Sequence, residues 1–107
     1  MPLPDPPPSD AEVVRRRLHR AAFGDVVREA RRDAEMSQEE LAMRAEVSRP
    51  TIARVEAGAH SITLDRLWAV AEALGVDAAT LIARTQDKAV DMAEREPRRG
   101  TAWRGLT

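Results

Sequence analysis

Residues 47–58 read VSRPTIARVEAG, and this stretch carries the local signals of a short helix with both ends marked. Ser48 is a preferred N-cap residue type. Pro50 fits the first helical turn, where a missing N–H removes no hydrogen bond. Gly58 suits the left-handed position that ends many helices. We therefore predict a helix over residues 48–57.

The two sides of this predicted helix differ in chemistry. Ile52 and Val55 lie three positions apart and form an apolar stripe that can face a core. Arg49 and Arg54 lie away from that stripe, about 140° apart around the axis. The helix is therefore expected to bury one side and to present guanidinium groups on the other.

A second helix is predicted directly before it. Ser37, followed three residues later by Glu40, forms the capping-box pattern, and the helix is expected to end near Ala45. The inner stripe of this helix consists of Leu41, Ala42 and Ala45. Only three residues, 46–48, join the two helices, with Val47 filling the angle between them, so the helices must cross steeply. That arrangement is a helix-turn-helix.

The outward side of helix 48–57 has the shape and charge to enter a DNA major groove. Ala53 is small and lets the helix sit deep, and arginine is the side chain best suited to a bidentate contact with guanine. The side chains on this outer face are Arg49, Pro50, Thr51, Ala53 and Arg54.

The remainder of the chain also reads as short helices. Residues 1–10 hold five of the seven prolines and are expected to form a disordered tail. Apolar residues recur at helical spacing over residues 11–35, with an interruption expected near Phe23 and Gly24. Further helices are predicted from a Thr63 cap to Gly75, and from Asp77 to as far as Glu96.

Composition places this pattern in the all-α class. Aromatic residues make up 3% of the chain and hydrophobic residues 43%, so the core must be aliphatic. We expect a compact bundle of five short helices with a helical N-terminal extension. The expected division is a tail over 1–10, a domain over 11–86 with its core at 24–84, and a helical extension and loose tail over 87–107.

Residues 24–84 resemble the helix-turn-helix domain of the phage-repressor and Cro family, also called the xenobiotic-response-element type. The matching stretches are VVREARRDAEMSQEELAMRAEVSRPTIARVEAG and TLDRLWAVAEALGVDAATLI. The resemblance implies base contacts by Arg49, Pro50, Thr51 and Arg54, and phosphate contacts by Gln38 and Ser48. It also implies that Glu56 is an internal structural partner.

One position departs from the family pattern. The family usually has glycine in the turn where this chain has Glu46, and a left-handed backbone there costs a non-glycine residue about 1 kcal/mol. Either the turn differs or the domain absorbs the strain.

Several residues have two interpretations. Arg49 and Arg54 could be solvated charges paired with neighbouring glutamates. His60 and Ser61 either contact backbone phosphates or lie in a solvated loop. The basic run RRRLHR at 15–20 either lies along phosphates or forms a solvent face, and the solvent face is favoured. Trp68 is expected to pack, with an exposed dimer anchor as the alternative, and Trp103 suggests docking on a partner or on the domain itself.

Other classes of protein lack the necessary residues. The chain has no cysteine and no tyrosine, and it has no glycine-rich phosphate loop, so an enzyme is not expected. No histidine and carboxylate set has metal-ligand spacing, and no cofactor is implied. No apolar run reaches the length of a membrane span, and no signal peptide is evident, so a cytoplasmic protein is expected.

The predicted function is that of a sequence-specific transcriptional regulator that binds double-stranded DNA as a homodimer. The net charge is −1, so DNA binding must use a local basic face. The dimer contact is expected in residues 76–96, from Val76, Leu81, Ile82, Val90 and Met92. The alternative is an antitoxin or adaptor module that binds a partner protein through its terminal segments.

Overall fold

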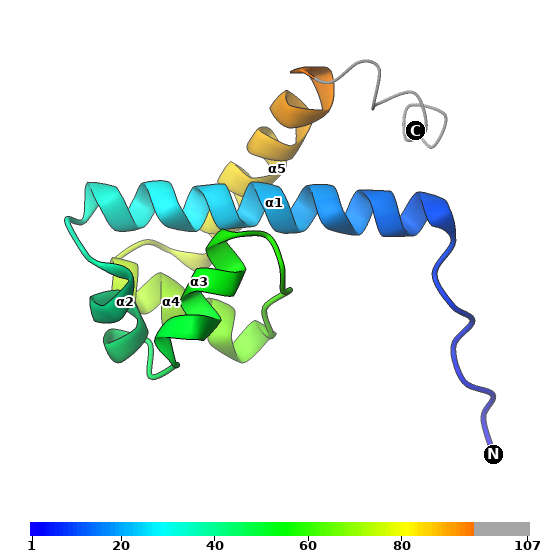
Figure 1. The fold of residues 1–107 in the computed structure, drawn as a ribbon, viewed down its shortest axis with the longest axis horizontal. Coiled ribbons are helices and arrows are strands. Elements are labelled where there is room, and N and C mark those ends of the chain that lie inside the picture. The colour runs from blue at the N-terminus through cyan, green and yellow to red at the C-terminus, as the bar shows by residue number, and fades with distance from the viewer. Residues whose placement is uncertain (96–107) are drawn as a thin grey trace.

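The computed structural model describes residues 1–95, and within that range the chain forms five α-helices and no strand. Figure 1 shows their order and arrangement. The all-α prediction is confirmed. The helices are α1 (Asp10–Asp33), α2 (Gln38–Arg44), α3 (Arg49–Glu56), α4 (Leu64–Leu74) and α5 (Ala78–Arg95). In this part of the chain, no helix is both long and apolar enough to cross a membrane.

The predicted caps are present at the helix ends. The Ser37 hydroxyl accepts a hydrogen bond from the backbone N–H of Glu40 at 3.0 Å. The Ser48 hydroxyl accepts one from the N–H of Thr51 at 3.2 Å. Thr63 caps α4, which ends at Gly75 in the left-handed conformation with φ of 70°. These caps satisfy N–H groups that have no partner inside a helix, and they explain why the predicted helix bounds agree with the structure.

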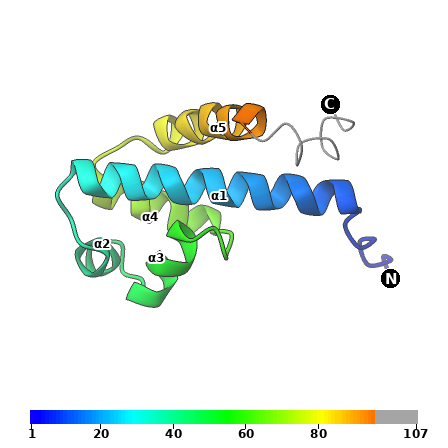
Figure 2. The ribbon, with the colours of Figure 1, turned by 45° about the horizontal axis from the view of Figure 1, so that its top comes forward.

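Helix α1 is the longest helix in residues 1–95, and the other four helices are arranged around it (Figure 1). Figures 1 and 2 show α2, α3 and α4 on one side of its C-terminal half and α5 on the other side, running in the opposite direction. The N-terminal half of α1 continues past α2, α3 and α4. The core between the helices is aliphatic, and its largest fully buried side chains are Leu41, Ile52, Leu81, Val27 and Val70.

Gly24 does not interrupt α1, which was expected to break near Phe23 and Gly24. The glycine is buried inside a continuous helix. An added Cβ at this position would lie 2.5 Å from the Val55 carbonyl oxygen and 2.6 Å from that of Glu56. The glycine therefore lets the end of α3 press against α1, a use of glycine that a helix-breaking interpretation of the sequence misses.

Three apolar residues are placed differently from the sequence-based expectation. Leu81 was assigned to a dimer surface, but it is fully buried in the core, and Val76 packs partly buried against the same core. Trp68 was expected to pack, yet it is 51% exposed. Ile82 and Val90 do remain exposed on α5. Helical spacing identifies an apolar stripe, but it does not show which residues of the stripe are buried by neighbouring helices.

Glu56, at the end of α3, is the only buried charged residue in the described chain. Arg31 of α1 donates to both carboxylate oxygens, from Nε at 2.7 Å and from Nη2 at 2.9 Å. The hydrogen bond from its guanidinium to Glu56 raises the pKa of Arg31 above its ordinary value, against the opposing effect of burial. Arg28 adds a bond from Nη2 to the Glu56 carbonyl oxygen at 2.7 Å. Glu56 is therefore the internal partner that was predicted.

The turn between α2 and α3 keeps the left-handed backbone despite its missing glycine. Glu46 has φ of 57°. The turn is closed by two hydrogen bonds, from the Glu46 N–H to the Met43 carbonyl and from the Val47 N–H to the Ala42 carbonyl, at 3.2 Å and 3.0 Å. Val47 also packs partly buried against the core, as predicted. The domain thus absorbs the strain of a left-handed backbone at Glu46.

Replacing Gly24 with alanine should lower the free energy of unfolding by about 1–3 kcal/mol, because the new methyl group meets backbone oxygens that cannot turn away. Urea denaturation measures the change. At a solvent-exposed position inside a helix, replacing glycine with alanine adds about 1 kcal/mol of stability. A higher free energy of unfolding in Gly24→Ala would therefore contradict the close approach of α3.

Replacing Glu56 with glutamine should cost about 3–5 kcal/mol, because it leaves the Arg31 guanidinium, whose side chain is only 12% exposed, without its counter-ion. Thermal unfolding followed by circular dichroism measures the loss. The matched control is Glu29→Gln, which breaks the ion pair between Glu29 and Lys88. The Glu29 side chain is 59% exposed, so the loss of this pair should cost less than about 1 kcal/mol. Equal losses in the two variants would show that Glu56 is not a structural anchor.

Replacing Glu46 with glycine should raise the free energy of unfolding by about 1 kcal/mol, because glycine adopts the left-handed backbone without steric cost. The control is Glu72→Gly, at an exposed position inside α4, which should lose about 1 kcal/mol. Chemical denaturation of both proteins should give changes of opposite sign, and a loss in both would refute the strain at Glu46.

Candidate nucleic-acid interface

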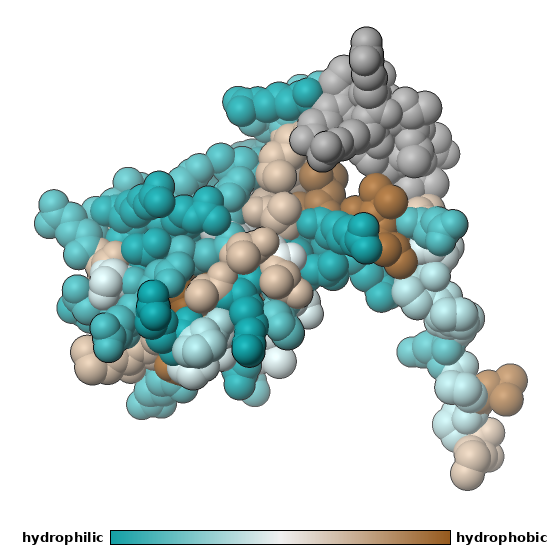
Figure 3. All heavy atoms as spheres, viewed as in Figure 1, coloured by the Kyte–Doolittle hydropathy of each residue, from teal (hydrophilic) through white to brown (hydrophobic). Residues whose placement is uncertain are grey.

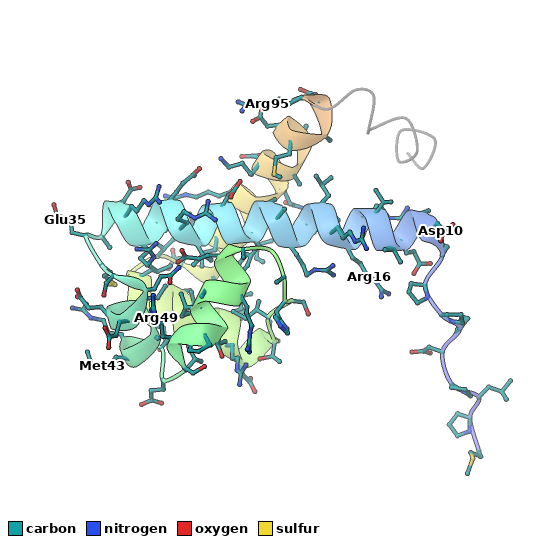
Figure 4. The ribbon with its side chains drawn as sticks, in the orientation of Figure 1. Asp10, Arg16, Glu35, Met43, Arg49 and Arg95 are labelled. Carbon is teal, nitrogen blue, oxygen red and sulfur yellow. The ribbon has the colours of Figure 1, made fainter. Side chains whose placement is uncertain are left out.

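The outer side of α3 presents the residues predicted to contact bases. Arg49, Pro50 and Arg54 are exposed, and Thr51 is half-buried beside them. Within residues 1–95, neither arginine forms a hydrogen bond or an ion pair, so the solvated pairing with Glu46 or Glu56 is not seen. Figure 4 marks Arg49 where α3 begins. Both guanidinium groups are therefore free to meet an external partner.

The inner side of α3 fixes how this face is presented. Ile52 and Val55 are 1% and 2% exposed and pack in the core with Leu41 and Ala42 of α2. The first residue of α2, Gln38, also contacts Glu56, the last residue of α3, so the two helices are joined at these ends. Figure 3 shows that the visible surface over these two helices is largely hydrophilic. A helix held in this way can enter a groove without exposing the core.

The two residues with predicted phosphate contacts at helix starts also have roles inside the protein. The Gln38 side-chain amide donates to the buried Glu56 carboxylate at 3.1 Å, which leaves one amide N–H for an external acceptor. The Ser48 hydroxyl lies 2.8 Å from that of Thr51 and caps α3. Both side chains are consequently held in place at the edge of the exposed face.

A polar hollow lies between α3 and the start of α4. Its volume is about 220 Å³. It brings Arg54 together with His60 and Ser61 of the connecting loop. Arg66 also lines the hollow, and sequence analysis missed it. Its position three residues after the Thr63 cap is the signal that could have found it, because first-turn residues of a helix lie close to the loop before it.

The described residues contain no cluster of three or more histidine, aspartate or glutamate side chains able to hold a metal ion. The arginines that line the hollow between α3 and α4, Arg54 and Arg66, are cationic. Their arrangement suits the binding of an anionic polymer through arginine hydrogen bonds and does not supply a set of metal ligands.

Comparison with known proteins agrees with this geometry. A family model described as helix-turn-helix matches residues 27–81, more than half of the chain. No curated protein matches the sequence. Among solved structures, the clp gene regulator ClgR from Corynebacterium glutamicum is 27% identical, with a TM-score of 0.67, over 79% of this chain and 92% of that chain.

Restriction-modification controller proteins are similar as well. C.AhdI from Aeromonas hydrophila is 31% identical, with a TM-score of 0.57, over 58% of this chain and 94% of that chain. C.Esp1396I, solved as a tetramer with its natural 35 base-pair operator, is 19% identical with a TM-score of 0.62, over 67% and 95% of the two chains. At 19% identity, the similarity to C.Esp1396I shows only a shared fold. The matched family model, together with the short turn that joins α2 to α3, shows that this chain belongs to the helix-turn-helix family of the phage-repressor and Cro type.

Proposed function

We propose that the protein is a sequence-specific DNA-binding transcriptional regulator that inserts α3 into the major groove. The observation that carries this proposal concerns Arg49 and Arg54, which lie on the exposed side of the second helix of a helix-turn-helix and have no hydrogen-bond or ion-pair partner within residues 1–95. Base contacts are assigned to Arg49, Pro50, Thr51 and Arg54. Phosphate contacts are assigned to Gln38, Ser48, His60 and Ser61.

The names of the similar structures support this assignment. ClgR is described as a regulator of clp genes, C.AhdI as a restriction-modification controller, and C.Esp1396I was solved on its operator. The regulators share the fold of this chain, and the cationic face lies on the element that their family uses for DNA. A regulator of this kind must reach the bacterial chromosome, which lies in the cytoplasm. We therefore expect a cytoplasmic protein.

We further propose that the protein binds as a homodimer. One recognition helix reads only a few base pairs, and two copies related by a twofold axis read two half-sites about 34 Å apart. The surface offered for the contact lies on α5, where Ile82 is 43% and Val90 is 59% exposed. A hollow of about 310 Å³ beside Val90, between α5 and α1, is lined largely by apolar side chains, and Figure 3 shows hydrophobic surface in this region.

Replacing Arg54 with alanine should weaken binding to an operator obtained by selection from random DNA, by at least about tenfold, because a bidentate base contact is worth about 1–3 kcal/mol. The thermal midpoint should not change, since Arg54 is exposed and makes no bond within residues 1–95. Gel-shift titration measures the affinity. The control is Arg84→Ala, an exposed arginine of α5, which should bind like wild type. Unchanged operator affinity in Arg54→Ala would refute the placement of the recognition helix.

A further inference from the structure

The N-terminal part of α1 lies outside the family domain and carries its own basic face. The family model begins at residue 27, whereas α1 begins at Asp10. Figures 1 and 2 show this part of the helix continuing past α2, α3 and α4. Arg16 and Arg20 are four positions apart within it and therefore project from the same side of the helix.

Arg20 lacks an acceptor in the described part of the chain. It lines a hollow of about 230 Å³ between α1, the α3–α4 loop and α5. Its Nε atom is buried, and no atom of residues 1–95 accepts a hydrogen bond from it. A guanidinium carries five N–H donors, and leaving the one on the buried Nε unpaired costs free energy, whereas the Nη groups are not buried and have no partner within residues 1–95. An arginine in this position is suited to an external anionic acceptor.

The hollow that holds Arg20 adjoins the hollow beside α3. His60 and Ser61 line both of them, so the α3–α4 loop separates Arg20 on one side from Arg54 and Arg66 on the other. Basic side chains thus continue from the recognition helix, across the loop, onto α1.

Arg16 extends this series along the projecting helix. Figure 4 shows it on the side of α1 where α3 lies. Its partner within the chain is Glu12, at 3.6 Å and on the exposed surface, where side chains of both residues are about half exposed. Exposed ion pairs of this kind are weak, so Arg16 can give up its pairing with Glu12 to pair with an anion that it binds more strongly.

We propose that Arg16 and Arg20 bind phosphates of the DNA backbone beside the segment that α3 contacts. This inference rests on the proposed function and extends its interface beyond the family domain. Continuity with the Arg54 hollow favours DNA over an acidic protein as the partner. The two arginines lie on a helix that runs past the bundle and do not sit on the groove-entering helix, so they contribute affinity that is independent of base sequence.

The test is the salt dependence of operator binding by the double variant Arg16→Ala/Arg20→Ala in the full chain. Each phosphate contact adds about 0.9 to the slope of log affinity against log salt, so the slope should fall by about 1.8. Affinity for operator and for unrelated DNA should fall by the same factor, which leaves the preference for the operator unchanged. The charge-retaining variant Arg16→Lys/Arg20→Lys should keep most of the wild-type slope.

The matched control is Arg84→Ala/Arg95→Ala, which removes two charges from α5. Arg95 forms an exposed pair with Asp91, four residues earlier, just as Arg16 does with Glu12. Helix α5 lies on the other side of α1 from α3 in both ribbon views, so the control should keep the wild-type slope.

The outcomes separate this inference from the proposed function. A wild-type slope in the double alanine variant, with operator binding still weakened by Arg54→Ala, would overturn the inference alone. Equal loss of slope in the double alanine variant and in the α5 control would also overturn it, because the effect would then be one of net charge. Absence of DNA binding by the wild-type protein would overturn the proposed function itself.

Discussion

The placement of the recognition helix depends on the buried ion pair between Glu56 and Arg31. This carboxylate ends α3 inside the protein, and the guanidinium of α1 contacts both of its oxygens. Gln38, the first residue of α2, donates to the same carboxylate. One buried charge therefore joins the three helices that must hold a fixed relation for α3 to fit a groove. Hydrophobic packing alone allows small rotations of such short helices, whereas a bidentate pair fixes both distance and direction.

Close approach of α1 and α3 is the second condition for this geometry. Gly24 provides it, because any side chain there would meet the carbonyl oxygens of Val55 and Glu56. The same carbonyl of Glu56 accepts a hydrogen bond from Arg28. The C-terminal end of α3 is thus held against α1 by backbone contact and by two arginines, while its N-terminal end and outer face stay exposed. The inner side and the last residue of this eight-residue helix anchor it, while its outer side carries Arg49 and Arg54.

Much of this fold could be predicted from local sequence signals. Ser37, Ser48, Thr63 and Gly75 determine helix ends through their own hydrogen bonds or backbone conformation, and such signals act over a few residues. The exposed arginines of α3 followed from the apolar stripe of Ile52 and Val55. Glu56 as an internal partner came from family resemblance, since an isolated glutamate gives no sign that an arginine 25 positions earlier will reach it.

The residues that were missed or misplaced depend on contacts between distant segments. Gly24 was read as a break because its role is visible only with α3 beside it. Leu81 and Trp68 both continue helical apolar patterns, yet one is fully buried and the other half-exposed, according to which helices cover them. Arg66 could be assigned to the candidate interface only from the structure, in which the loop after α3 folds so that Arg54, His60 and Arg66 line one hollow. The contacts of the site residues with DNA stay predictions.

The most direct test of DNA recognition by α3 is selection from random double-stranded DNA with the purified wild-type protein and with an Arg49→Ala/Arg54→Ala variant. The wild-type protein should enrich a motif with two symmetric half-sites about one helical turn apart, each containing guanine. The variant should lose the guanine preference. A wild-type selection without an enriched motif, or the same motif from both proteins, would contradict the account.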